Sequence, residues 1–93
     1  PIRSDADRVA LQKALQSGDI DWVATDHAPH ELETKQTDFA KASFGTIGVE
    51  TALQVLLTLL SKGLLSREKL VETFSTKPAK FLGIENEFGA IEE

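Results

Sequence analysis

The chain has 93 residues, of which 41% are hydrophobic and 27% are charged, and its formal net charge is −5. Its length allows one domain with a modest core, and the negative charge argues against binding to nucleic acid or to an anionic membrane, which needs clustered Lys and Arg. The sequence contains no cysteine, which excludes disulfides and thiolate metal sites and fits a cytoplasmic protein.

The amino-terminal part of the chain predicts a helix and then a strand. The helix covers about residues 5–17, where Ser4 can cap it, Asp7 completes a weak form of the capping box and Gly18 supplies a stop. Residues 20–25 (Ile-Asp-Trp-Val-Ala-Thr) predict a strand because they form a short run rich in β-forming residues. Apolar side chains fall on both faces of this strand, as in a parallel sheet that is covered on both sides.

A long polar connection and three more helices follow. The connection covers about residues 27–46, and a loop of that length in a compact domain is usually functional or mobile. The helices are predicted over about residues 47–62, 67–75 and 78–82, and the first has so little polar face that we expect it to be nearly engulfed. One strand cannot make a sheet, so we expect the neighbours of residues 20–25 to lie outside this chain.

The ends of the sequence lead to the same expectation. The chain begins at Pro1, contains no Met and ends at Glu93 without a closing element, so we expect a segment of a longer protein. No signal peptide is visible, and the longest apolar run, around residues 52–60, is far shorter than a membrane-spanning helix.

The stretch with the most distinctive chemistry follows the predicted strand and includes Asp26, His27 and His30, the last two being the only histidines. Catalytic groups collect at the carboxyl ends of parallel strands, where an acid can bind a metal and exchange a proton. A histidine in the adjoining loop can ligate metal or donate to a substrate carboxylate. The alternative is a polar turn that Pro29 shapes and in which Asp26 bonds nearby N–H groups. Residue types and spacing leave both interpretations open.

Several stretches of the sequence resemble class I dihydroorotase, a family of the amidohydrolase superfamily. They are TDHAPH after GDIDWVA, FGTIGVETALQVLLT, FSTKPAKFLGI and the opening PIRSDADRVALQKAL. The resemblance covers essentially the whole chain and is most specific at residues 26–30. Allantoinases and hydantoinases share the Asp-His pair but differ in the residues that follow it.

The resemblance implies an α/β fold, the (β/α)8 barrel, in which residues 20–26 are the eighth strand and the segment itself is mainly helical. Residues 84–93 would lead toward a small β domain. Asp26 would ligate zinc, accept the proton of a zinc-bound hydroxide and pass it to the departing amide nitrogen. His30 would hold the substrate carboxylate, and the backbone of Phe44 and Gly45 would hydrogen-bond the substrate.

The implied reaction is the reversible hydrolysis of dihydroorotate to N-carbamoyl-L-aspartate in pyrimidine biosynthesis. The family uses two zinc ions, and its other ligands lie upstream of this chain, so we expect the isolated segment to be inactive and to need the remainder of the barrel as its partner. Lys77 stands where relatives usually have Asn.

The alternatives are a segment of another cyclic-amide hydrolase, of allantoinase or hydantoinase type, and a non-catalytic helical module that associates through apolar surface. A homo-oligomer is compatible with the dihydroorotase interpretation and with the association module.

Overall fold

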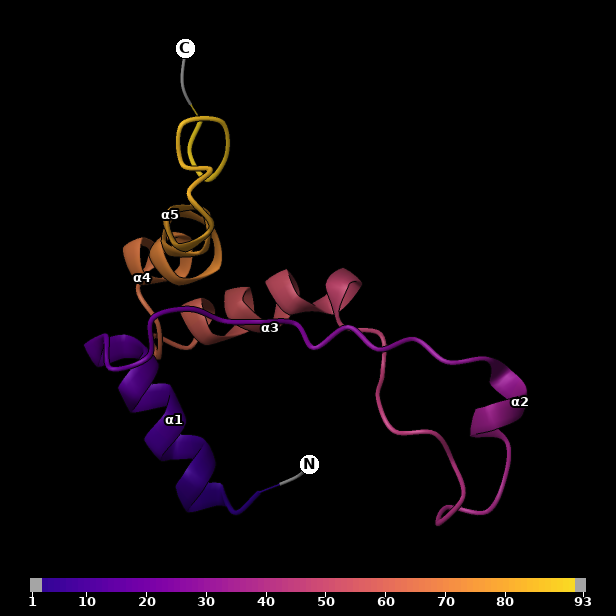
Figure 1. The fold of residues 1–93 in the computed structure, drawn as a ribbon. Coiled ribbons are helices and arrows are strands. Elements are labelled where there is room, and N and C mark those ends of the chain that lie inside the picture. Colours follow the sequence, from indigo (N-terminus) through magenta and orange to yellow (C-terminus); the bar gives the residue numbers. More distant parts are fainter. Residues whose placement is uncertain (1–2, 92–93) are drawn as a thin grey trace. The chain divides into compact units, whose positions relative to one another are not determined.

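A computed structural model of the chain describes residues 3–91 (Figure 1). The helices in chain order are α1 (Asp5–Ser17), α2 (Leu32–Lys35), α3 (Val49–Ser61), α4 (Arg67–Val71), the π-helical turn η1 (Glu72–Thr76) and α5 (Lys77–Leu82). The described chain divides into two compact units, which are Thr25–Val55 and residues 3–24 together with 56–91. No helix within the described residues is long and apolar enough to cross a membrane.

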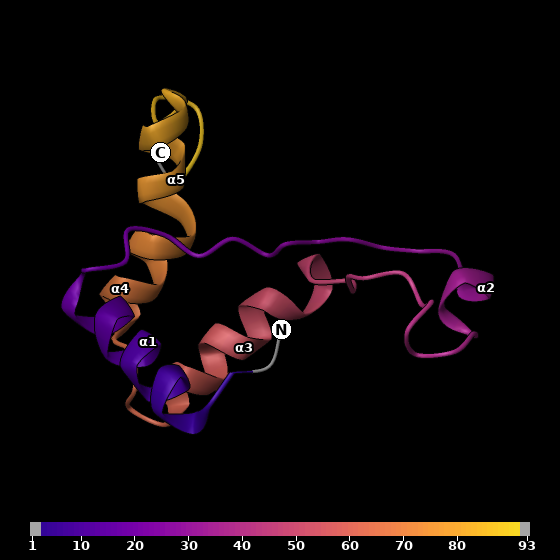
Figure 2. The same cartoon turned by 60° about the horizontal axis from the view of Figure 1, so that its bottom comes forward.

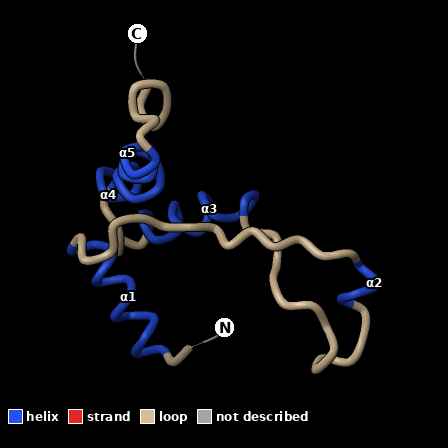
Figure 3. Tube along the Cα trace, viewed as in Figure 1, coloured by secondary structure: helices blue, strands red, loops and turns tan. Residues whose placement is uncertain are grey.

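The prediction that the chain is mainly helical is confirmed, but the strand predicted over residues 20–25 is not formed. Figure 3 shows helices and loops and no strand among residues 3–91. A strand exists only where a neighbouring extended segment completes a hydrogen-bonded ladder, and residues 20–25 have no such neighbour in the described part of the chain. Just after this segment, His27 and Thr46 form an isolated parallel β-bridge.

Helix α1 occupies the range expected from the sequence because both of its ends carry strong local signals. The Ser4 hydroxyl accepts a hydrogen bond from the Asp7 N–H at 3.2 Å, and the Asp7 carboxylate accepts one from the Ser4 N–H at 3.2 Å. This is the complete capping box. At the other end Gly18 adopts φ 94°, and its N–H donates to the Ala14 carbonyl oxygen at 3.1 Å.

The larger unit has a small leucine core. Four leucines are buried in it and five partly buried side chains pack against them: Leu15, Leu56, Leu65 and Leu70, with Ile20, Val23, Leu59, Leu60 and Phe74. Helix α3 is less covered than its composition predicts. Val55 is 58% exposed and Leu57 is 45% exposed. The sequence predicts that α3 is nearly engulfed, but within residues 3–91 part of its apolar surface is open to solvent.

Helices α4 and α5 join through η1 into one helical run, which can be followed in Figure 2. The sequence predicts a break before Pro78, but the π-turn accommodates the proline. The Lys77 N–H donates to the carbonyl oxygen of Glu72, five residues earlier. The next carbonyl in that pattern, on Thr73, would need an N–H from Pro78, which has none. Instead it accepts the N–H of Val23 at 3.0 Å, so the proline leaves an acceptor that anchors the segment after α1.

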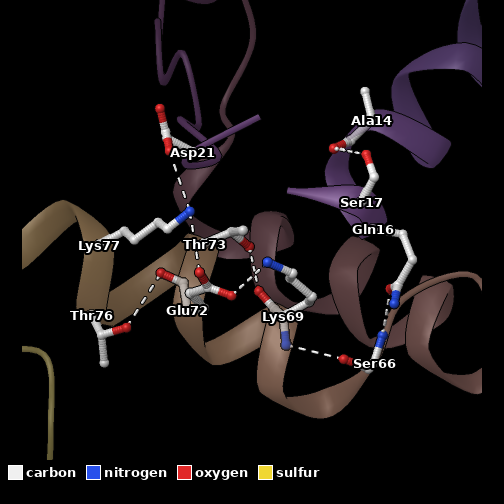
Figure 4. A network of polar contacts seen from close by, with 10 residues as sticks. All are labelled: Ala14, Gln16, Ser17, Asp21, Ser66, Lys69, Glu72, Thr73, Thr76 and Lys77. Atoms are coloured by element: carbon white, nitrogen blue, oxygen red, sulfur yellow. Dashed lines mark hydrogen bonds and ion pairs between the residues drawn. The ribbon is translucent and has the colours of Figure 1, made fainter. Parts of the chain in front are cut away.

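Charged side chains surround this turn (Figure 4). Lys77 Nζ lies 3.2 Å from a carboxylate oxygen of Asp21 and 3.1 Å from one of Glu72, and Lys69 Nζ lies 2.8 Å from the other Glu72 oxygen. Hydrogen bonds from Lys69 and then from Lys77 lower the pKa of Glu72. Hydrogen bonds to Glu72 and then to Asp21 raise the pKa of Lys77. Lys77 therefore helps to hold the segment around Asp21 beside η1.

Candidate functional site

The predicted site residues lie in the unit Thr25–Val55, where the stretch after residue 25 runs beside the stretch that leads into α3. The N–H of Ala28 donates to the Thr46 carbonyl oxygen at 2.9 Å, and His27 and Thr46 form the parallel bridge. The loop between these two stretches contains α2 (Figure 1). Residues about twenty positions apart in the sequence are thus joined at the base of a single loop.

Asp26 is exposed and has an uncommon backbone conformation, with φ 48°. This left-handed conformation is disfavoured for residues with a side chain, although Asp tolerates it better than most. The Asp26 carboxylate forms no hydrogen bond or ion pair with another residue in the range 3–91. Residues held in such conformations cluster at functional sites, and here the carboxylate is left open for a ligand.

His27 has a contact that sequence analysis did not find. Its Nδ1 accepts the N–H of Gly48 at 3.0 Å and the N–H of Val49 at 3.2 Å. These two N–H groups lie at the amino end of α3, where backbone N–H groups have no partner within the helix. The His27 imidazole therefore caps α3, although it lies about twenty residues before the helix in the sequence. One indirect signal for such a contact is present in the sequence. No Ser, Thr, Asp or Asn stands immediately before Val49, so α3 lacks a side-chain cap from its own N-terminal residue.

Two glycines permit the close packing of the stretches. A Cβ atom on Gly48 would lie 2.6 Å from the Thr25 carbonyl oxygen. A Cβ atom on Gly45, whose φ is 112°, would lie 2.6 Å from the Ala28 Cβ and 3.4 Å from Nε2 of His30. The structure therefore brings His30 and Gly45 together, and the adjoining Phe44 side chain is 91% exposed.

Lys35, at the end of α2, holds the far side of this loop and was also missed by sequence analysis. Its Nζ donates to the Ser43 carbonyl oxygen at 2.6 Å and to the carbonyl oxygen of Gly45. The Ser43 N–H in turn donates to the Thr34 carbonyl oxygen at 3.1 Å. The predicted loop over residues 27–46 thus contains a helical turn and a lysine clamp that together shape the backbone at Gly45.

The side chains at this site can supply part of the coordination shell of a metal ion but not all of it. Asp26 offers an unpaired carboxylate, and His30 offers an imidazole, while Nδ1 of His27 already accepts two N–H groups. Within residues 3–91 no three His, Cys, Asp or Glu side chains gather where they could share a metal ion. The Asp26 carboxylate fits zinc as a hard oxygen ligand, and the other ligands would have to come from elsewhere.

Residues 3–93 match the family model described as "Amidohydrolase family". Among curated relatives, a dihydroorotase of Desulforapulum autotrophicum is 54% identical over 86 residues, which are 92% of this chain and 20% of that protein. Dihydroorotases of Elusimicrobium minutum and Enterococcus faecalis are 48% and 45% identical, each over 90% of this chain and 20% of the relative. The chain therefore spans about a fifth of the length of these relatives.

Among solved structures, a D-hydantoinase is similar to this chain with a TM-score of 0.87 and 29% sequence identity. The similarity covers 99% of this chain and 21% of that protein.

Proposed function

The chain belongs to the amidohydrolase family, and on that premise we propose that it forms part of a zinc-dependent dihydroorotase, which interconverts dihydroorotate and N-carbamoyl-L-aspartate in pyrimidine biosynthesis. The similarity to dihydroorotases over 90% or more of the chain supports this activity. The observation that carries the proposal is the packing of Gly45 against His30, because it joins the two stretches that the activity requires at one place.

In this proposal the chain contributes the last strand and flanking helices of a (β/α)8 barrel. Residues 20–26 would pair with strands from the rest of the full-length protein, which would supply the ladder that is not formed within residues 3–91. The similarity to D-hydantoinase along 99% of the chain supports a shared architecture. Large apolar side chains that are exposed in the described residues would be covered in the same way: Phe39, Val49, Val55, Phe81 and Phe88.

Asp26 is the proposed catalytic residue. Zinc, held in part by Asp26 and otherwise by groups outside this chain, would polarise the amide carbonyl and activate water. Asp26 itself would take up a proton during attack on the ring and deliver it to the departing amide nitrogen, which is a poor leaving group without one. Its unpaired and exposed carboxylate is suited to both tasks.

His30, Phe44 and Gly45 are the proposed substrate-binding residues. An imidazole N–H of His30 would donate to the substrate carboxylate, and backbone groups of Phe44 and Gly45 would hydrogen-bond the ring. Fixed donors are needed because the open form of the substrate is a dianion, whereas the chain has a net charge of −5. The absence of a side chain at Gly45 leaves the backbone close to His30.

The test uses the full-length protein that carries this chain, assayed for zinc content and for dihydroorotate hydrolysis. Asp26→Ala should abolish turnover while circular dichroism and thermal unfolding stay close to those of the parent. Asp26→Asn, which keeps the shape of the side chain but neither its charge nor its basicity, should be equally inactive. A zinc-loaded parent protein without activity on dihydroorotate would show that the proposal is wrong.

A hydantoinase-type activity is the second candidate, favoured by the structural similarity to D-hydantoinase. Substrate chemistry separates the two activities, because dihydroorotate has a carboxylate that simple 5-alkyl hydantoins lack. If His30 anchors this carboxylate, His30→Gln should raise KM for dihydroorotate. Turnover of the hydantoin alone, unaffected by His30→Gln, would favour the second candidate.

A further inference from the structure

We infer that His27 is a positioning residue: its imidazole accepts at Nδ1, with a ring proton on Nε2, and so caps α3 and holds Asp26 in its working position. The catalytic consequence rests on the function proposed above. The tautomer and the cap concern the fold alone, so they can be tested without any assay of activity.

The tautomer follows from the two hydrogen bonds. The backbone N–H groups of Gly48 and Val49 both point to Nδ1 of His27, at 3.0 and 3.2 Å. A backbone N–H can only donate, so Nδ1 must carry a lone pair. The single ring proton of a neutral imidazole is then on Nε2. The positive end of the α3 dipole stabilises the same arrangement, because the lone pair faces the amino end of the helix.

The link to Asp26 comes from its two neighbours in the chain. On one side the Thr25 carbonyl oxygen packs so closely on Gly48 that a Cβ atom there would lie 2.6 Å away. On the other side the His27 ring binds the same turn of α3, and the His27 N–H donates to the Thr25 hydroxyl at 3.3 Å. Asp26 therefore sits between two residues that are both fixed to the start of α3, and this supports its left-handed φ of 48°.

The cap also ties the two parts of the candidate site together. The parallel bridge between His27 and Thr46 and the hydrogen bond from Ala28 to Thr46 lie immediately beside the cap. Thr46 follows Gly45 directly, so displacement of the ring would disturb both Asp26 and the backbone proposed to bind substrate. A cap that served only helix stability would not have this effect on catalysis.

The first experiment measures the histidine tautomer in the full-length protein by nitrogen NMR with ¹⁵N-labelled histidine. His27→Asn assigns the signal by its loss. The expected result is an Nε2–H tautomer for His27, with Nδ1 at the chemical shift of a hydrogen-bonded acceptor. An Nδ1–H tautomer would overturn the inference whatever the enzyme's activity, because that nitrogen could not accept from Gly48 and Val49.

The second experiment compares three substitutions in the same protein. His27→Asn places an amide oxygen near the position of Nδ1, His27→Gln places it near the position of Nε2, and His27→Ala removes the acceptor. We expect His27→Ala and His27→Gln to lower kcat about 100-fold, as misplacement of a reacting group by about an ångström does, with a smaller change in KM. His27→Asn should recover kcat to within about tenfold of the parent, since it restores the cap.

The outcomes are distinguishable. If His27→Gln is as active as His27→Asn, or if His27→Ala keeps kcat within about twofold while α3 stays folded, the positioning role is wrong. If His27→Ala fails to fold, the Asn and Gln variants decide the question, because both keep a polar side chain. If the parent protein has no dihydroorotase activity but His27 shows the Nε2–H tautomer, the cap stands and only the proposed function fails.

Discussion

The ring of His30 and the backbone of Gly45 lie against each other, so that a Cβ atom on Gly45 would stand 3.4 Å from Nε2 of His30. The same atom would stand 2.6 Å from the Ala28 Cβ, and the φ of Gly45 is 112°. Only glycine meets both requirements, the lack of space and the backbone conformation. The contact therefore depends on the residue type at position 45, which makes it open to test.

Gly45→Ala in the full-length protein should raise KM for dihydroorotate by roughly tenfold or more, because the backbone must move away from Ala28 and this changes its position beside His30. Gly63→Ala is the matched control. Gly63 also has a positive φ, 68°, but nothing lies within 4 Å of a Cβ atom there. The control should lose only about 1 kcal/mol of stability, the cost of a left-handed conformation for alanine. Equal values of KM for both variants would contradict the proposed role of Gly45.

Lys35→Met should loosen the loop that leads to Gly45, because the carbonyl oxygens of Ser43 and Gly45 lose their ammonium donor. Methionine keeps most of the apolar stem, so the change isolates the two hydrogen bonds. We expect faster amide hydrogen exchange over residues 36–45 and a higher KM. The local stability of the loop should fall by an amount on the order of 1 kcal/mol.

Lys41→Met is the comparison for that variant. Lys41 forms an ion pair with Asp38 in which both side chains are largely exposed, at 74% and 75%. Exposed ion pairs contribute little to stability. The hydrogen exchange and KM of Lys41→Met should therefore remain near those of the parent protein. If both lysine variants behave alike, Lys35 does not clamp the loop.

Thr73→Val should destabilise the protein by about 1 kcal/mol, because the buried hydroxyl donates to the Lys69 carbonyl oxygen and valine leaves that bond unmade. Thr73 is 0% exposed and the hydrogen bond is 2.7 Å long. Thr76→Val provides the control, since Thr76 is exposed and its bond to the Glu72 carbonyl oxygen is 3.4 Å long. Thermal unfolding should separate the two variants, and an equal or larger effect at Thr76 would speak against the importance of burial.

The charges around η1 should give stability a plateau between acid and alkaline losses. Lys69 and Lys77 lower the pKa of Glu72 from its ordinary 4.5, so its contribution is present above pH 4.5 and is lost as pH falls through the folded-state value. Glu72 and Asp21 raise the pKa of Lys77 from its ordinary 10.5, so its contribution is present below pH 10.5 and is lost as pH rises through the higher value.

Glu72→Gln should therefore lower the free energy of unfolding at neutral pH and make no difference once the pH is below the folded-state pKa of Glu72. Chemical unfolding of the parent and the variant across this range measures the difference directly. A difference that persists unchanged into acid would mean that the charge on Glu72 is not its cause.

Sequence analysis located the elements whose ends are locally encoded. The capping box of Ser4 and Asp7 and the left-handed Gly18 bound α1 through contacts within a few residues, so its range was predictable. Asp26, His30 and Gly45 could be singled out because of their chemistry and family resemblance, and their roles stay predictions. The strand predicted over residues 20–25 is not formed within residues 3–91, because a strand requires a neighbour and β-forming residues alone do not supply one.

Residue types and local spacing thus determined the mainly helical character of this chain and the stretch in which its candidate chemistry lies. Only the tertiary structure decided which distant groups meet. The His27 ring accepts from the N–H groups at the start of α3, and the Lys35 ammonium donates to the Gly45 carbonyl oxygen. The Thr73 carbonyl oxygen accepts the N–H of Val23, because Pro78 has no N–H to donate. Each of these contacts joins residues ten or more positions apart. Side chains and carbonyls at such separations meet only after the backbone has folded, so no local pattern records them.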